Sequence, residues 1–452
     1  MFRLFAANRL AASLLLAAVA IAHASTRPHY GGTLRVEVQA DPWQAPDSIG
    51  RSLVFDSLTR AGASGETGPA LATRWTSQNG NHRWQFWLRP GVHFHDGTLL
   101  TPDLALQSLT HSCTQCPWLT VRALGDSLVF TTSSPNPVLP AELSRSLYAI
   151  AKSDASGTAS GTGAFRFVSN QNYVLSLAAV DDAWQGRPFV DAVQISGRRI
   201  IRNQWLDLLS GQADIVDVPP ENLRQAQQEH LNIVQFPACD LLVLGVSHVG
   251  TLADDSQREA ISLAVDRAAI YNVIFQKQGE VTASLLPNAL TGYSFLFPID
   301  RDLARSQAVK GAGTRTPLTL SVDDGNAAVR LAADRIAINL QEAGFHVQVA
   351  SRPANTDLSG TSDLVLRRIH RESGESQAAL QQMLESFNQQ LSDESNDPAA
   401  LYRQESAFLQ NHFAVPLLFL PRAYAAGPRV HGLRLSNGGL PLIGDVSLED
   451  AK

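Results

Sequence analysis

Residues 71–109 read LATRWTSQNGNHRWQFWLRPGVHFHDGTLLTPDLALQSL, and the interpretation of the whole chain starts from them. Tryptophan and phenylalanine alternate with polar residues on both sides of Asn79-Gly80, a dipeptide that strongly favours a hairpin turn. Farther along, Thr101-Pro102 provides a helix cap residue followed by proline at the first helical position. The stretch therefore predicts a pair of strands, a second turn and a helix.

Residues 1–24 have the composition of a secretory signal peptide. Two arginines precede a largely apolar run over residues 10–21, and an A-x-A cleavage site ends at Ala24. This run is too short to span a membrane, and no other apolar run approaches the length that a membrane helix needs. No cysteine follows the cleavage site, so we expect no lipid anchor. The mature chain, residues 25–452, is predicted to be periplasmic with no membrane span.

Length and charge narrow the class of protein further. The mature chain is long enough for two or three domains. The whole chain has a formal charge of −6, and residues 1–24 contain two arginines and no acidic residue, which leaves −8 on the mature chain. This mildly acidic, mixed composition argues against nucleic acid or an anionic membrane as the main partner.

The three cysteines are expected to be structural. Cys113 and Cys116 form a C-x-x-C pair, which is compatible with a redox motif, half a zinc site or a local disulfide. No second pair stands at zinc-finger spacing, and an oxidising compartment favours the disulfide. Cys239 lies in the apolar run 236–246 and is predicted to be a buried thiol.

Several motifs together resemble those of a known family. The tryptophan hairpin, the L-R-P-G-V-x-F-x-D-G run and the T-P-x-D helix start of residues 71–109 are similar to the signature of the family 5 extracellular solute-binding proteins. Further similar segments are GGTLRV at 31–36, the G-T-G turn at 161–163, DDAWQGRP at 181–188 and REAISLAVDR at 258–267. The resemblance covers most of residues 30–445.

The resemblance implies an α/β fold of the periplasmic-binding-protein type. We expect two lobes with mixed β-sheets flanked by helices, and a large first lobe that carries an extra subdomain. The boundaries implied are a first lobe over 25–237 with the subdomain at about 50–160, a second lobe over 238–425, and a return segment over 426–452.

Within the expected second lobe, one unit is predicted by pattern alone and one segment departs from the family. A strand at 318–322, a helix at 327–342 and a strand at 345–350 form a βαβ unit, with Gly344 closing the helix. The segment 363–401, where the family has its tryptophan-containing ligand region, is instead rich in Gln and Glu and is predicted to be helical.

Candidate ligand-binding residues follow from the resemblance. It places three segments at the cleft: the loop after the first strand at 39–43, the strand end at 245–248 and a second-lobe loop at 290–297. Aromatic side chains suit the walls of such a site, and a few polar groups orient the ligand. The candidates within these segments are Trp43, Ser247, His248, Tyr293 and Phe295.

No catalytic or metal-binding motif stands out. His93, His95 and Asp96 could offer two nitrogens and a carboxylate to a metal, but they lie in a hairpin whose Asp-Gly pair is needed for the turn. The chain has no G-x-S-x-G elbow and no H-E-x-x-H pair. We therefore expect neither an enzyme nor a cofactor.

The sequence predicts the substrate-binding component of an ABC importer. The resemblance implies a monomer that captures a peptide-like or other small organic solute by lobe closure and presents it to the permease. The changed segment 363–401 favours an alternative, a divergent family member that no longer transports and serves as a sensor or assembly component. A secreted hydrolase on the same scaffold is a third, weaker hypothesis.

Overall fold

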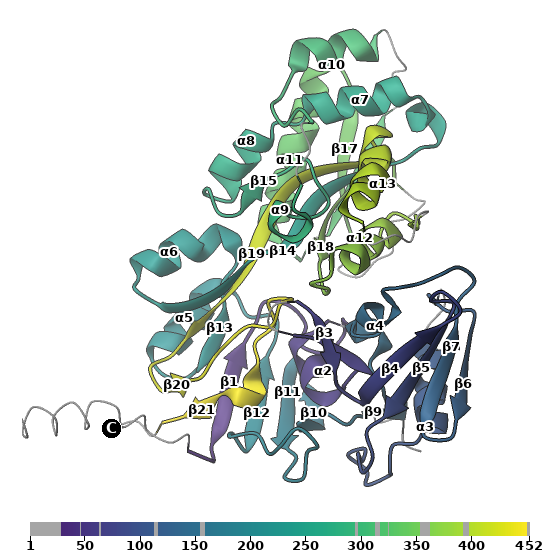
Figure 1. Cartoon of the computed structure of the whole chain (residues 1–452). Helices are drawn as coiled ribbons and strands as arrows, with labels where there is room; N and C mark the ends of the chain where they lie inside the picture. Colours follow the sequence, from purple (N-terminus) through teal and green to yellow (C-terminus); the bar gives the residue numbers. More distant parts are fainter. Residues whose placement is uncertain are drawn as a thin grey trace, which may run out of the picture.

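The computed structural model describes residues 29–449 apart from 46, 63–64, 113–115, 154–158, 294–296, 312–316, 324, 353–361 and 392–396. The predicted signal peptide lies outside these residues. The described chain forms two lobes joined by two long strands, β14 (Asn232–Val246) and β19 (Ala414–Ala426) (Figure 1). None of the described helices has both the length and the apolar composition needed to cross a bilayer.

One mixed sheet runs through both lobes. In the described residues it has eleven strands, and the β1–β12 and β16–β17 pairs are parallel while the β14–β19 pair is antiparallel. Strand β15 (Glu280–Val281) pairs with β19 beside the main order. That order is β10 (Phe165–Gln171), β11 (Val174–Ala179), β12 (Ala192–Ser196), β1 (Thr33–Glu37), β13 (Ile215–Asp217), β19, β14, β18 (Leu364–His370), β16 (Leu318–Asp323) and β17 (Val347–Arg352).

The predicted hairpin forms the centre of a separate four-stranded sheet. Asn79 and Gly80 both have positive φ, 53° and 61°, which is the conformation that the Asn-Gly turn supplies readily. Helix α3 (Pro102–Ser112) covers this sheet and starts at the predicted proline. The strand order is β4 (Ala72–Gln78), β5 (Arg83–Leu88), β7 (Ser127–Thr131) and β6 (Thr120–Leu124).

The G-T-G turn packs against the end of α2 (Ile49–Val54). A Cβ atom on Gly161 would lie 1.9 Å from the carbonyl oxygen of Val54, so this position has no room for a side chain. Buried Asp56, just after α2, accepts hydrogen bonds from Thr162 Oγ1 and Trp184 Nε1, both at 2.9 Å. Two of the family-like segments are therefore tied to one buried carboxylate.

The remaining elements are short strand pairs and helices that cover the sheets. The pairs are β2 (Thr59–Ala61) with β3 (Thr67–Pro69), β8 (Lys152–Ser153) with β9 (Ala159–Ser160), and β20 (Val430–His431) with β21 (Ser447–Leu448). The first-lobe helices are α4 (Leu139–Glu142), α5 (Ile201–Leu209) and α6 (Leu223–Gln228). The second-lobe helices are α7 (Asp255–Ala264), α8 (Arg267–Ala269), α9 (Asn288–Thr291), α10 (Leu303–Lys310), α11 (Ala327–Glu342), α12 (Ser376–Glu385) and α13 (Pro398–Gln410).

Each lobe has its own apolar cores. In the first lobe they gather around β1 and around the four-stranded sheet, and in the second lobe they lie on the two faces of β14 and β18. The boundaries predicted near 238 and 425 fall inside β14 and β19, which continue from one lobe into the other. These boundaries stay a prediction.

The segment 363–401 is not wholly helical, as its composition had suggested. Its first residues form β18, which is hydrogen-bonded between β14 and β16 in the interior of the sheet. Leu364 and Leu366 are fully buried there, so tertiary packing overrides the local helical preference of the flanking Gln- and Glu-rich residues. The helical prediction holds for α12 and α13 only.

Candidate functional site

The two lobes contact each other along a seam. We define the seam as first-lobe residues 65–67 and 138–148 together with second-lobe residues 371–385. In Figure 1 the chain descends from the end of β18 toward the first lobe and then enters α12, which faces α4. One small cluster of buried apolar residues draws on both sides of the seam: Val138, Ala141 and Ala378.

Two second-lobe glutamates accept hydrogen bonds from first-lobe backbone and hydroxyl groups. Oε2 of Glu372 accepts from the backbone N–H of Ser146 at 2.7 Å and from its hydroxyl at 2.6 Å. Oε1 of Glu375 accepts from the N–H of Thr67 at 3.1 Å and also from the Thr67 hydroxyl. Because hydrogen bonds to charged acceptors are strong, these contacts hold the lobes together.

Arg145 adds ion pairs across the same seam. Its Nη1 atom lies 2.8 Å from Oε2 of Glu385, and its Nε atom lies 4.0 Å from Oε1 of Glu372. The Arg145 side chain is largely buried, so solvent screens these pairs less than it screens ion pairs on the open surface.

A buried first-lobe carboxylate, Glu142, lies behind Arg145. Oε2 of Glu142 accepts a 2.8 Å hydrogen bond from Nδ2 of Asn136. Burial, with a smaller contribution from the nearby charge of Glu385, raises the pKa of Glu142 to about 7, although Asn136 and Arg145 act in the opposite direction. Glu142 therefore titrates near neutral pH, unlike an exposed glutamate.

The return segment closes the seam from a third side. Gly65 and Gly374 lie backbone to backbone, because a Cβ atom on Gly374 would come within 2.3 Å of the Gly65 Cα. The same Cβ atom would lie 2.0 Å from Nδ2 of Asn437. Residues from three distant parts of the sequence therefore meet at one point with no space for larger side chains.

A buried charge cluster ties the strands together where the chain crosses between the lobes. Asp240 on β14 pairs with Nδ1 of His370 at 2.8 Å, with Nε of Arg422 at 3.1 Å, and with Arg368. Burial would raise the pKa of Asp240, but the nearby cations outweigh it and hold this pKa well below its ordinary value. Asp240 is therefore charged at neutral pH.

The loop after β1 is held by another buried carboxylate, Asp217. Its side chain accepts from the backbone N–H of Gln39 at 3.1 Å and from Nε2 of Gln204 at 2.6 Å. Burial raises the pKa of Asp217 to about 6. Within this loop the candidate Trp43 packs on Phe55 and Phe167 at the edge of the first-lobe core, with ring centroids 5.7 and 5.2 Å apart.

The other candidate residues lie elsewhere. Ser247 and His248 follow β14 at its second-lobe end, beyond Val246, and the His248 ring packs against Phe413 at 5.3 Å. The hydroxyl of Tyr293 donates to Oε2 of Glu405 at 2.9 Å, within the second lobe. Phe295 lies outside the described residues. The structure does not bring the candidates into one site, and their contact with a ligand stays a prediction.

Besides Nε of Arg145, which makes only the 4.0 Å ion pair with Glu372, three polar atoms around the seam are buried without a hydrogen-bond partner. They are Nε of Arg371, Oε1 of Gln377 and Nδ2 of Asn437, from the loop before α12, from α12 and from the return segment. Buried polar groups in native proteins are nearly always hydrogen-bonded, so a buried polar atom without a partner needs a structural or functional explanation. A ligand with polar groups of its own could supply the missing partners.

His95 and Asp96 of the H-x-H-D motif make contacts that support the local fold. His95 donates from Nε2 to the carbonyl oxygen of Gly163 at 2.9 Å, and burial lowers its pKa. Asp96 pairs with Nζ of Lys152 at 2.7 Å, and this contact lowers the pKa of Asp96 to about 2. His93 is exposed on the same hairpin. Among the described residues no group of three potential ligands is placed to hold a metal.

The cysteines differ in state. Cys116 is disulfide-bonded, and Cys113, its expected partner, lies outside the described residues. Cys239 is a free buried thiol, as its apolar sequence context predicted. Burial raises its pKa to about 11, so the unreactive thiol form dominates at neutral pH.

Comparison with known proteins identifies the scaffold. The family model "Bacterial extracellular solute-binding proteins, family 5 Middle" matches residues 66–390. The chain belongs to the family 5 solute-binding proteins. Proteins of this family are binding components that work with ABC permeases, and nickel and peptides are among their ligands.

Individual members of family 5 are distant relatives. The nickel-binding protein NikA of Staphylococcus aureus is 26% identical over 235 residues, which cover 49% of this chain and 48% of NikA. The HTH-type transcriptional regulator SgrR of Shigella flexneri is 29% identical over 161 residues, 31% of this chain and 28% of the regulator. The chain thus matches about half or less of the length of these relatives.

Two solved family 5 structures share the whole fold. NikA of S. aureus in complex with Ni(L-His)2 superposes with a TM-score of 0.79 at 17% identity and covers 92% of this chain and 100% of its own. DppA of Helicobacter pylori in complex with the peptide STSA gives 0.80 at 18% identity, covering 93% and 99%. At these identities the likeness establishes the fold, and it confirms the predicted two-lobed α/β class.

The seam carboxylates are the site residues that sequence reasoning missed. Glu372, Glu375 and Glu385 stand in the segment that departs from the family pattern, and no motif marks them. The available signal was the presence of these glutamates in a segment that the resemblance assigns to ligand binding. Their role became visible only when the fold placed the end of β18 opposite residues 138–148.

Proposed function

We propose that the protein captures a small organic solute between its lobes, at the seam, and presents it to an ABC importer permease. The observation that carries this proposal is the set of buried polar atoms without partners on Arg371, Gln377 and Asn437. They come from the second lobe and the return segment, and a solute that enters when the tight Gly65–Gly374 contact opens would satisfy them. The family assignment supports the same reading.

The charges at the seam favour a solute with an amino group or another cation. The second lobe offers Glu372, Glu375 and Glu385, and Arg145 is the cation that faces them from the described part of the first lobe. An ammonium group would take the place of the Ser146 contacts to Glu372 and form charge-assisted hydrogen bonds there. A peptide-like solute has this chemistry. When the lobes open and close around the solute, contacts between the lobes would be exchanged for contacts with the solute.

The capture is proposed to take place in the periplasm, after removal of residues 1–24. We expect the capture to be binding without a covalent step, in line with the family assignment. Related proteins bind chemically different ligands, Ni(L-His)2 in one structure and the peptide STSA in another. The shared fold does not determine which solute is bound, so we expect the side chains at the seam to determine it.

A thermal-shift screen of residues 25–452 tests the proposal. The panel contains dipeptides, oligopeptides, nickel with and without histidine, and small sugars. A solute at a hundredfold excess over Kd stabilises the native state by about 2.7 kcal/mol. We expect stabilisation by an amino-bearing solute, and Glu372→Gln should weaken its binding at least about tenfold because a charged acceptor is lost.

Glu342→Gln is the matched control for that variant. Glu342 is also in the second lobe and also pairs with an arginine, Arg301, but it lies outside the seam. The control should bind like the wild type. Unchanged melting curves across the whole panel, or equal weakening by both variants, would contradict capture at the seam.

A second candidate function is sensing without transport. Two observations favour it: the changed segment 363–401, and the similarity of part of the chain to a protein named as a transcriptional regulator. Both functions share solute capture and differ in its consequence. Uptake of labelled solute by cells with and without the gene distinguishes them, since only an importer component changes the uptake rate.

A further inference from the structure

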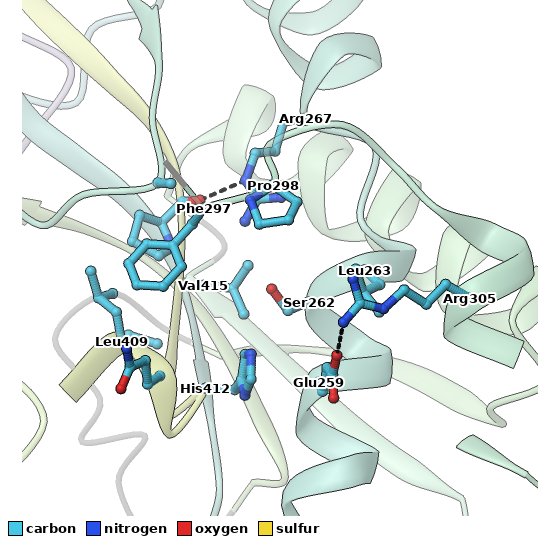
Figure 2. A pocket seen from close by; sticks show the side chains of 14 residues that line it. Glu259, Ser262, Leu263, Arg267, Phe297, Pro298, Arg305, Leu409, His412 and Val415 are labelled. Carbon is cyan, nitrogen blue, oxygen red and sulfur yellow. Dashed lines mark hydrogen bonds and ion pairs between the residues drawn. The ribbon is translucent and has the colours of Figure 1, made fainter. Parts of the chain in front are cut away.

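A cavity lies in the second lobe, away from the seam. It has a volume of about 280 Å³ and is bounded by α7, the end of α13 and the first residues of β19 (Figure 2). Strand β19 enters this region at Ala414 and reaches the crossing between the lobes only near Arg422. The cavity and the seam are therefore at opposite ends of the same strand.

An arginine with no acidic partner lines this cavity. Arg267 is only 3% exposed, and its Nε donates to the carbonyl oxygen of Pro416 at 2.8 Å. Its Nη1 donates to the carbonyl oxygen of Ile299 at 3.4 Å. Among the described residues it forms no ion pair. Burial lowers the pKa of Arg267 to about 10, which leaves it charged at neutral pH. A buried cation without a counter-charge is costly, so an anion beside it is favoured.

The other charges around the cavity do not neutralise Arg267. Glu259 is paired with Arg305 at 2.6 Å, and in Figure 2 this ion pair lies at one side of the cavity. His412 contacts Asp255 at 3.3 Å from Nδ1. Glu259 thus already has Arg305 as its partner and Asp255 has Arg258, so among the described residues neither carboxylate neutralises Arg267.

The remaining walls are mostly apolar. Figure 2 shows Pro298 beside Arg267, Phe297 and Leu409 at the left of the view, and Val415 between Phe297 and Ser262. The hydroxyl of Ser262 points into the space between them. Apolar walls with a few placed polar groups, here Ser262, Arg267 and the paired Glu259 and Arg305, are the usual composition of a small-molecule site, and this volume is at the small end of such sites.

We propose that this cavity binds a small organic anion, with its carboxylate at Arg267 and its apolar body against Phe297, Leu409 and Val415. The guanidinium fork matches the two oxygens of a carboxylate and can donate to both. The ligand is restricted to one small ring or a short branched chain by the volume of the cavity. The site is independent of solute capture at the seam and would give the protein a second ligand.

Saturation-transfer NMR with the chain purified after export tests this site. Benzoate is the probe, and benzamide, which has the same ring and no charge, is the matched control ligand. We expect benzoate to bind at least tenfold more tightly than benzamide. Ser262→Phe, which fills the cavity from a half-buried position, should abolish benzoate binding, while Glu372→Gln at the seam should leave it unchanged.

Ala283→Leu fills the same cavity from another wall and serves if Ser262→Phe does not fold. Equal binding of benzoate and benzamide would overturn the role of Arg267. Benzoate binding that survives in a folded cavity-filling variant would overturn the location. Loss of benzoate binding in Glu372→Gln would overturn the independence of the two sites, and with it the proposal.

Discussion

At the scale of single residues, two buried carboxylates show how neighbours decide charge. Asp240 is surrounded by Arg368, His370 and Arg422, and the charges of the two arginines together with the hydrogen bond to His370 keep its pKa low despite burial. Glu142 has an amide as its hydrogen-bond partner, and burial raises its pKa to about 7. The same chemical group is therefore a fixed charge at the crossing strands and a titrating group beside the seam.

Glu142→Gln should change how stability depends on pH. The folded wild type keeps the Glu142 proton up to about pH 7, whereas the unfolded chain releases it near the ordinary value of 4.5. The free energy of unfolding of the wild type is therefore highest below the pKa that Glu142 has in the unfolded chain. It falls as the pH rises toward the pKa that Glu142 has in the folded chain. Glu142→Gln has no proton to release here and does not lose stability in this way. At pH 8 its free energy of unfolding should therefore exceed that of the wild type by on the order of 3 kcal/mol.

Urea unfolding of both proteins at pH 4.5 and pH 8 measures this difference. Glu229→Gln, at an exposed position in the first lobe, is the control and should follow the wild type at both pH values. Glu405, whose pKa is also about 7, is present in all three proteins and cancels in the comparison. A constant gap between Glu142→Gln and the wild type would contradict the shifted pKa.

Single residues were also where sequence reasoning was weakest. The predicted thiol Cys239 is buried and free, because an apolar run is a direct signal of burial. Ser247 and His248, in contrast, were assigned to the cleft by resemblance alone. They follow β14 at its second-lobe end, and their contact with a ligand stays a prediction.

At the scale of elements, local patterns predicted the structure well where they were strong. The helix expected at 327–342 is α11 with those limits, and Gly344 follows it with a φ of 89°. The hairpin around Asn79-Gly80 forms as expected. Strand β18 was missed because it is short and lies among helix-favouring residues, and its place between β14 and β16 is set by long-range pairing.

The seam elements should respond to loss of Arg145. Arg145→Gln removes the ion pairs to Glu385 and Glu372 and should destabilise contact between the lobes by about 1–3 kcal/mol. We expect a larger radius of gyration in small-angle X-ray scattering. Arg187→Gln is the control, because Arg187 also pairs with two carboxylates, Asp181 and Asp191, but within the first lobe.

The control should leave the radius of gyration at the wild-type value. If Arg145→Gln does so too, while remaining folded by circular dichroism, the ion pairs do not hold the lobes together. The seam would then rest on its apolar contacts and on the hydrogen bonds to Ser146 and Thr67.

At the scale of the whole molecule, one sheet connects both lobes. Strands β14 and β19 belong to the first lobe at one end and to the second lobe at the other, with a register shift between Phe236 and Asp240 (Figure 1). The proposed movement between the lobes would have to be absorbed in these two strands. The Asp240 cluster ties β14, β18 and β19 together beside the register shift, whereas the seam is held by side-chain contacts that can be exchanged.

The measurement that tests the central claim most directly is hydrogen–deuterium exchange of the mature chain with and without the solute that stabilises it. Capture between the lobes predicts slower exchange at residues 65–67, 138–148 and 371–385 together, because a bound solute protects both sides of the seam. Protection confined to one lobe, or centred on the cavity beside Arg267, would contradict capture at the seam.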